Sequence, residues 1–414
     1  MKPWFRGGRV SLISKLAIVS VFALLLSFFV TNLSTAKNIS QSHKVAHEVA
    51  HKLASPIKSA AKRASFHTVI FPKSFYSNIS SPFLNNAGVV IKDLASGQTL
   101  YSHGADILRA PASVLKLVST TSSLETLGPD KKFKTSIYLT STPDHFVILG
   151  ESDPWLSFNS LEVEKYHRAF FPALINSALK QPGAGSSLTI DYAGVYQADM
   201  QNLVKYFAPR IKITLNKLTS VDDAPSDEGA EVSSITSPSV SEIIKFTLLW
   251  SDNLLADRLA RISAIKLGFG GNATGINKLF DSVLDNLGVS HTGLQVFDGN
   301  GLSHKTKISA NTIEELLFKI KTVPSLNVIY EGLPTAGKTG TLASRFVSDA
   351  PSAVALIHAK TGWINNTVSL AGFAKNGQNS YVFTIIDNHV KNSEYYRGLA
   401  RIQIDKALAA IAHK

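Results

Sequence analysis

Two side chains three residues apart can supply a nucleophile and its base. Ser113 and Lys116 belong to the run Pro111 to Lys116, and this spacing places both side chains on one face of a helical turn. A serine in a first helical turn gains from the helix N-terminus, whose field favours a developing oxyanion. The lysine accepts the serine proton only when its amine is neutral, which requires burial or a nearby second cation. The pair therefore indicates serine acyl transfer.

The Ser-x-x-Lys spacing alone is weak, because it also begins at Ser34, Ser55, Ser59 and Ser263. The first three fall in the N-terminal segments described below. Ser263 falls inside a predicted helix, where the terminal field does not reach. Ser113 differs because it opens a helix after a predicted hairpin, with strands at 87–92 and 98–102.

Ser251, Asp252 and Asn253 form a second polar group between apolar helical runs at 243–250 and 254–262. A serine and an asparagine in such a turn put a hydroxyl and a carboxamide into one cleft. The hydroxyl can relay a proton to a leaving amine, and the amide can hold a substrate backbone. A plain helix-capping turn is the structural alternative, since all three residue types are good N-caps.

The tripeptide Lys-Thr-Gly occurs twice. The copy at 338–340 has no strand before it, whereas the copy at 360–362 ends a β-rich run at 353–359. A cation on a strand edge beside the nucleophile requires the second context. We therefore choose Lys360, whose charge can bind a substrate carboxylate and help to keep Lys116 neutral.

The elements around these residues predict a mixed fold. Strands are expected at 367–374 and 381–386, and a final helix from about 393 to 413. The 414 residues are 44% hydrophobic and 17% charged, which excludes a disordered chain and suggests two to three domains. The absence of cysteine excludes disulfides, thiolate metal sites and cysteine nucleophiles.

Residues 1–36 are typical of an export signal, either a cleaved signal peptide or an N-terminal anchor. Basic residues precede an apolar run of 15 residues from Leu16 to Val30, and the small residues Ser34 to Ala36 follow. The run is short for a membrane span, which needs about 20 residues. We therefore expect the rest of the chain outside the cytoplasm, in the cell wall or at the outer face of the membrane.

Positive charge is concentrated in the first 80 residues, with 11 Lys/Arg and one acid, against 31 and 29 in residues 81–414. We predict a basic tether at 37–82 that can meet a membrane surface, and no nucleic-acid partner. The tether contains an H-E-x-x-H pattern at 47–51, preceded by His43. A catalytic zinc also needs a third ligand and a shaped cavity, so we predict no metal site there.

Six ordered blocks together resemble the class C low-molecular-mass penicillin-binding proteins, which are D-alanyl-D-alanine carboxypeptidases and endopeptidases. The blocks are a first hairpin at 89–102, the nucleophile run at 111–116, Ser251-Asp252-Asn253, a D-G-S-G-L-S-like segment at 298–303, an L-P-x-A-G-x-x-G-T-L-like segment at 333–342, and His358 to Gly362 with its following strand. The fifth block accounts for the first Lys-Thr-Gly as a coincidence.

The resemblance implies an α/β (α+β) transpeptidase fold of the penicillin-binding-protein and β-lactamase type, an antiparallel sheet flanked by helices. The peptidase domain would span 83–140 and 233–414, with an inserted smaller domain at 141–232. It implies a serine DD-peptidase, carboxypeptidase or endopeptidase, that cleaves D-Ala-containing bonds of peptidoglycan stem peptides through an acyl-serine. β-Lactams would acylate it, and no cofactor or metal is expected.

The site residues implied by the resemblance fall into two groups. The catalytic group is Ser113, Lys116, Ser251 and Asn253, and the substrate-binding group is Lys360, Thr361, Gly362 and Trp363.

Two departures from the family pattern leave an alternative open. Trp363 occupies a position where the family usually has a threonine that helps to hold the terminal carboxylate, and Ser152 replaces a glycine in a G-x-G-D-P-like segment at 150–154. Tryptophan keeps its backbone N–H, so an oxyanion hole built from the amides of Ser113 and Trp363 would survive. The change in carboxylate recognition could favour cleavage of cross-links. The alternatives are a non-catalytic peptidoglycan-binding or penicillin-binding module and another serine acyl hydrolase on this fold.

Overall fold

The computed structural model describes residues 70–84, 86–182, 185–224 and 229–414. The expected export signal, most of the tether and the H-E-x-x-H pattern lie outside the described residues. Within these ranges, no helix is long and apolar enough to cross a membrane.

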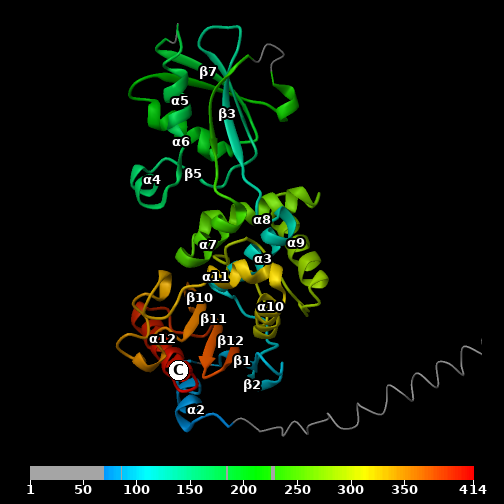
Figure 1. The fold of residues 1–414 in the computed structure, drawn as a ribbon, viewed down its shortest axis with the longest axis vertical. Coiled ribbons are helices and arrows are strands. Elements are labelled where there is room, and N and C mark those ends of the chain that lie inside the picture. Colours follow the sequence, from blue (N-terminus) through cyan, green and yellow to red (C-terminus); the bar gives the residue numbers. More distant parts are fainter. Residues whose placement is uncertain (1–69, 85, 183–184, 225–228) are drawn as a thin grey trace, which may run out of the picture. The chain divides into compact units, whose positions relative to one another are not determined.

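The main sheet has five antiparallel strands in the order β10-β11-β12-β1-β2, as Figure 1 shows for its central members. The strands are β1 Gly88–Asp93, β2 Thr99–His103, β10 Ile357–Ile364, β11 Thr367–Asn376 and β12 Asn379–Asp387. The predicted antiparallel sheet is thus confirmed. The strand before Lys360 was predicted to start at 353 but starts at Ile357, because Pro351–Ala353 forms a 3₁₀ turn. It also continues past Gly362, which puts Lys360 in its interior.

One face of this sheet is covered by α12 (Glu394–Ala409) and α2 (Lys73–Ile79). Phe75 and Ile79 of α2 are buried in one cluster with Val89 and Ile91 of β1. The folded part therefore begins before residue 83, the predicted boundary. Helix α2 has two buried apolar residues, Phe75 and Ile79, which are too few for the sequence to show a clear periodic pattern.

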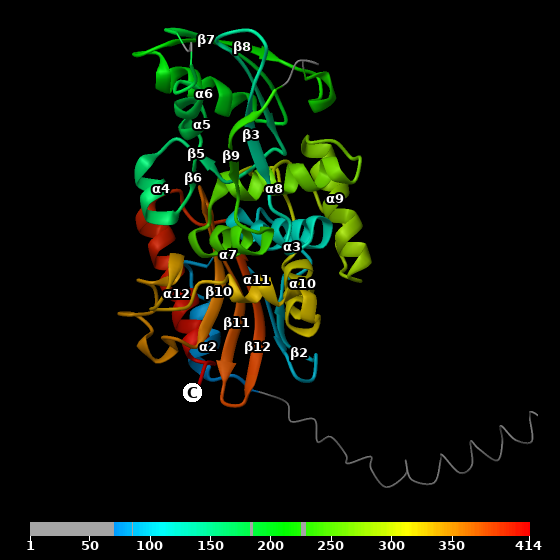
Figure 2. The same cartoon turned by 45° about the horizontal axis from the view of Figure 1, so that its top comes forward.

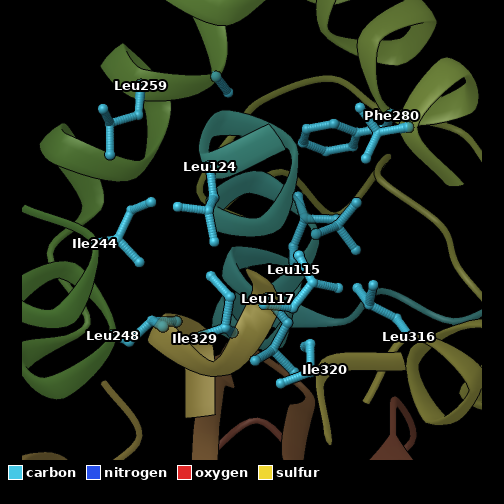
Figure 3. Close-up of a cluster of buried hydrophobic side chains, with 14 of the residues drawn as sticks. Leu115, Leu117, Leu124, Ile244, Leu248, Leu259, Phe280, Leu316, Ile320 and Ile329 are labelled. Atoms are coloured by element: carbon cyan, nitrogen blue, oxygen red, sulfur yellow. The ribbon is translucent and has the colours of Figure 1, made fainter. Parts of the chain in front are cut away.

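The other face carries a helical layer around α3 (Lys116–Leu127), which follows directly on the 3₁₀ turn η2 (Ala112–Leu115). Figure 2 shows α7, α8, α9, α10 and α11 around α3, and Figure 3 shows the apolar side chains that they bring together. Their bounds are α7 Val240–Trp250, α8 Asn253–Lys266, α9 Ala273–Asn286, α10 Ala310–Thr322 and α11 Asn327–Glu331.

Helix α3 is buried on all sides from Lys116 to Leu124, although it contains several serines and threonines. Small hydroxyls suit such a position because they can bond back to the helix's own carbonyls. Thr120 Oγ1 donates to Lys116 O at 2.6 Å, and Ser123 Oγ donates to Ser119 O at 2.8 Å. The helix behind the nucleophile is therefore packed closely from every direction.

A second five-stranded sheet, in the order β8-β7-β4-β3-β9, forms between α3 and α7 in the chain. Its strands are β3 Lys134–Leu139, β4 His145–Gly150, β7 Ser187–Ala193, β8 Lys212–Lys217 and β9 Glu231–Thr236, with short strands β5 Leu156–Ser157 and β6 Ala169–Phe170 outside it. The helices of this region are α4 Ser160–Tyr166, α5 Pro172–Ala178 and α6 Gln197–Phe207. The sheet extends beyond the predicted insert at 141–232, because β3 and β9 pair with each other at its two ends.

Candidate active site

Ser113 lies in the 3₁₀ turn η2, which is fastened from two sides. Ser369 Oγ of β11 donates to Pro111 O at 2.7 Å. On the other side, a Cβ added to Gly301 would lie 1.9 Å from Ala112 O, so only glycine fits against this turn. Ala112 itself has φ +50°, a conformation that L residues rarely adopt. The backbone before Ser113 is therefore held in a strained shape by its neighbours.

Lys116 is fully buried beneath Ser113, and its Nζ has three partners. It donates to Ser113 Oγ at 2.8 Å, to Asn253 Oδ1 at 2.7 Å and to Asn300 O at 2.8 Å. Burial lowers the pKa of Lys116 to about 7, although the charges of Asp252 and Asp298 act in the opposite direction. A large fraction of Lys116 is therefore neutral near pH 7, as a base for Ser113 must be.

Lys360 and Ser251 form the opposite wall. Ser251 ends α7 with φ +59°, and Lys360 Nζ donates to Ser251 Oγ at 2.8 Å and to Thr361 O at 2.9 Å. Lys360 is fully buried, and its pKa is lowered by burial and then by the charge of Lys116. The charge of one buried amine disfavours the charge of the other, so the two lysines are not readily protonated at the same time.

The outer edge of β10 is hydrogen-bonded to a neighbouring segment along its first part and open along the rest. Before Lys360 it is covered, because Ala336 N donates to Ile357 O at 2.9 Å and Ala359 N donates to Pro334 O at 3.0 Å. From Lys360 to Ile364, no strand among the described residues pairs with this edge. An open strand edge offers backbone donors and acceptors to an extended peptide. A peptide bound here would lie directly beside Ser113.

Gly362 and Thr361 fit β10 to its surroundings in two ways. A Cβ on Gly362 would lie 2.0 Å from Ser369 Oγ and 2.8 Å from Pro111 O, so the strand approaches the nucleophile turn only with glycine at this position. Thr361 Oγ1 donates to Thr341 Oγ1 at 3.0 Å, which orients a hydroxyl along the open edge.

Trp363 lies opposite Val368 in β11, on the sheet face that α12 covers. The guanidinium carbons of Arg397 and Arg401 stand 5.0 Å and 4.3 Å from its ring centroid. Thr361 lies on this same face, two residues earlier, whereas Gly362 meets the nucleophile turn from the other face. The large side chain therefore does not fill the space above Ser113.

The structure thus brings together Ser113, Lys116, Ser251 and Asn253 with Lys360 and its strand neighbours. Two further contributors were missed, the carbonyl of Asn300 and the hydroxyl of Thr341. Both lie in blocks that we had recognised only as family resemblance. Because these two blocks occur in the same order as in the related family, they could have been predicted to contribute to the site.

The competing pair Ser263 and Lys266 does not form a site. Ser263 Oγ donates to Leu259 O within α8 at 2.8 Å, and Lys266 is exposed. No cluster of three metal-binding side chains occurs in the part of the chain that the structure describes.

The inserted region touches the same site through α8. Arg168 Nη1 lies 3.6 Å from Asp252 Oδ2, and Arg258 of α8 is paired with the buried Asp199 at 2.7 Å. Ser152, the second departure, has φ +61° and donates its N–H to Gly194 O at 2.6 Å. Serine therefore adopts the left-handed backbone that a glycine would favour here, and the local turn is kept.

The site has three parts: a Ser-x-x-Lys pair where the turn η2 meets α3, with its lysine fully buried, a Ser-x-Asn turn facing it, and a lysine on an open antiparallel edge. Together they define an acyl-serine enzyme of the penicillin-binding-protein class. Comparison with known proteins specifies the family. Residues 75–169 and 197–411 match the D-Ala-D-Ala carboxypeptidase 3 (S13) family. The chain belongs to this family of serine DD-peptidases.

Relatives and solved structures agree with this assignment. The carboxypeptidase DacB of Mycolicibacterium smegmatis is 25% identical over 72% of this chain and 75% of its own length. A D-alanyl-D-alanine carboxypeptidase from an Actinomadura species is 24% identical over 75% and 79%, respectively. Among structures, penicillin-binding protein 4 of Haemophilus influenzae superposes with a TM-score of 0.63 at 16% identity, covering 80% of this chain and 98% of its own. This last likeness confirms the predicted fold class.

Proposed function

We propose that the protein is an exported serine DD-peptidase whose nucleophile is Ser113 and whose base is Lys116. The observation that carries this proposal is the hydrogen-bonded group in which one buried amine of lowered pKa contacts both Ser113 Oγ and Asn253 Oδ1. A buried lysine without an ion pair is costly to keep in a folded protein, and activation of a nucleophile explains its presence.

The reaction follows from the contacts. Neutral Lys116 takes the Ser113 proton while Oγ attacks the D-Ala carbonyl, and the backbone amides of Ser113 and Trp363 stabilise the oxyanion. Ser251, hydrogen-bonded to Lys360, relays the proton that Lys116 took from Ser113 to the departing amine, so that both side chains end the step in their starting protonation states. Asn253 aligns the acyl half of the peptide, and Lys360 with Thr361 holds the departing half. Water then hydrolyses the acyl-serine and frees Ser113.

The substrate that fits this edge is an extended peptide ending in D-Ala-containing bonds, the stem peptide of peptidoglycan. Both carboxypeptidase and endopeptidase activities are consistent with the open edge of β10. Related proteins carry both descriptions, since a structure of 16% identity is a peptidoglycan endopeptidase of Bdellovibrio bacteriovorus with a TM-score of 0.54. β-Lactams present the same carbonyl and carboxylate and would acylate Ser113.

Peptidoglycan lies outside the cytoplasm, so this activity requires export. The pattern of residues 1–36 supports export, and the basic excess in the first 80 residues supports contact with an anionic membrane surface. Fractionation of cells expressing the full-length chain tests this part: recovery with the cytoplasmic proteins would contradict it.

The first experiment is covalent labelling of the purified full-length protein with a fluorescent penicillin, followed by a denaturing gel. We expect a labelled band that Ser113→Ala removes, with the melting temperature of the variant close to that of the wild type. A band that persists in Ser113→Ala would show that another residue is the nucleophile. No band from a folded wild type that still binds peptidoglycan would favour the non-catalytic binding module instead.

A further inference from the structure

One feature of the site is not used by the mechanism above. Arg397 and Arg401 are one turn apart on α12, and both guanidinium groups stand over the indole of Trp363, at 5.0 Å and 4.3 Å. Residues four apart on a helix lie on the same face. Two cations are therefore gathered around one aromatic side chain of the substrate-binding strand.

Most N–H donors of this pair have no acceptor within the described residues, although the carboxylates of Asp405 and Glu394 lie near enough to act on the charge of Arg401. Among the described residues, Arg401 has no ion pair or hydrogen bond, and Arg397 donates only to the neutral Asn392 Oδ1, at 3.0 Å. The nearby buried carboxylate, Asp405, is bound by a third arginine, Arg345. Arg397 Nε is moreover buried without a partner. Guanidinium groups that stack on an aromatic face keep their N–H edges available for a carboxylate.

The position of the pair relates it to the bound peptide. Trp363 directly follows Gly362, lies on the same face as Thr361, and belongs to the segment of β10 whose edge is open. Thr361 and Lys360 are the groups to which the mechanism assigns the departing half of the peptide. The two arginines are therefore on the side of the strand where the departing half of the peptide and its carboxylates would lie.

We propose that Trp363, Arg397 and Arg401 form a subsite for carboxylates of the departing peptide, and that this subsite favours an acidic peptide longer than a single D-alanine. The proposal rests on the proposed DD-peptidase function. A guanidinium group binds a carboxylate through two parallel N–H donors, which a threonine hydroxyl cannot do. The indole adds a flat apolar surface for a chain that continues beyond the first residue. The departing strand of a peptidoglycan cross-link has both properties, whereas free D-alanine has only one carboxylate and no further chain.

The test compares substrates that differ only in the departing group. The full-length protein is given a cross-linked peptide dimer, a pentapeptide ending in D-Ala-D-Ala, and the dimer with its departing-strand carboxylates converted to carboxamides. For the wild type we expect the highest kcat/KM with the acidic dimer. In Arg397→Gln/Arg401→Gln, the ratio of kcat/KM for the acidic dimer to that for its carboxamide should fall about tenfold or more, the effect of a lost charge-assisted hydrogen bond.

Two further variants keep the result interpretable. Lys406→Gln removes an exposed charge from the last turn of α12 and should leave the selectivity ratio unchanged. Arg397→Lys/Arg401→Lys retains the charge without the planar donors, and should give an intermediate ratio if the double glutamine variant is unstable. A wild type that hydrolyses all three substrates, with equal ratios in every variant, would overturn the subsite alone. A wild type that hydrolyses none of them and forms no penicillin adduct would overturn the proposed function.

Discussion

The two Lys-Thr-Gly tripeptides have the same sequence, but one lysine is exposed to solvent and the other is buried. Lys338 is exposed in a turn that follows α11, and no hydrogen bond or ion pair of its side chain occurs among the described residues. Lys360 is fully buried in β10 and bonded to Ser251. The motif alone therefore carries no chemistry. A strand edge beside a nucleophile is what turns the lysine into a functional group.

The two glycines show the same contrast in the backbone. Gly340 has φ +52°, and a Cβ there would lie 2.3 Å from Leu249 O, so it shapes the turn that packs on the end of α7. A Cβ on Gly362 would collide with Ser369 Oγ and Pro111 O, the atoms that fasten the nucleophile turn. Both positions need glycine, one for the fold and the other for the position of Ser113.

The largest difference is expected from the lysines. Lys360→Ala should lower the acylation rate of Ser113 by roughly 10²–10⁴-fold, since it removes a preorganised cation and the partner of Ser251. Lys338→Ala should leave the rate unchanged. The measurement is the second-order rate constant for labelling by a fluorescent penicillin. Equal rates in the two variants would remove the distinction between the tripeptides.

The glycines separate activity from stability. Gly362→Ala should abolish labelling, because the added methyl must displace β10 or the turn that carries Ser113. Gly340→Ala should reduce the free energy of unfolding by about 1–3 kcal/mol through strain and overpacking, while the folded protein labels at a rate close to that of the wild type. Denaturant unfolding and labelling of the same samples test both. A Gly340→Ala protein of normal stability would show that the turn relaxes easily.

The pH dependence of acylation tests whether Lys360 acts on Lys116 through its charge. The neutral form of Lys116 increases as pH rises through its pKa of about 7, so the labelling rate should rise through the same range and then level off. A nearby cation lowers the pKa of a lysine, so Lys360→Met should move the midpoint to higher pH. Lys338→Met is the matched control and should leave the midpoint in place. A midpoint unmoved in both variants would show that burial alone sets the pKa of Lys116.

The threonines should give the smallest effect. Thr361→Val removes one hydroxyl from the open edge and from its contact with Thr341, and should reduce kcat/KM for a substrate with a free carboxylate by about three- to tenfold. Thr339 Oγ1 accepts from Thr335 N at 2.9 Å in the other tripeptide. Thr339→Val should therefore cost about 1 kcal/mol of stability without changing kcat/KM. A rate loss in Thr339→Val that matches that of Thr361→Val would contradict the assignment.

The hairpin before Ser113, the strands after Lys360 and the final helix were predicted from the sequence, because each has a clear hydrophobic period or turn cluster. The bounds of the folded part were not. Helix α2 lies before the predicted peptidase domain, and strand β3 lies before the predicted insert to whose sheet it belongs; the places of both depend on packing or pairing with distant segments. Thr341 was missed as a site residue for the same reason, since its partner Thr361 is 20 positions away.

What the sequence by itself determined is local. The spacing of Ser113 and Lys116 brings their side chains to one turn, because the period of a helix acts over three or four residues. The sequence context favoured Lys360 and Asn253, but only the tertiary structure shows the contacts themselves, from Lys360 to Ser251 across 109 positions and from Lys116 to Asn253 across 137. It also decided that Trp363 lies against α12 rather than over Ser113. The lowered pKa of Lys116 also depends on the tertiary structure. Its main cause is desolvation, which comes from all the elements that surround α3 and not from any short segment.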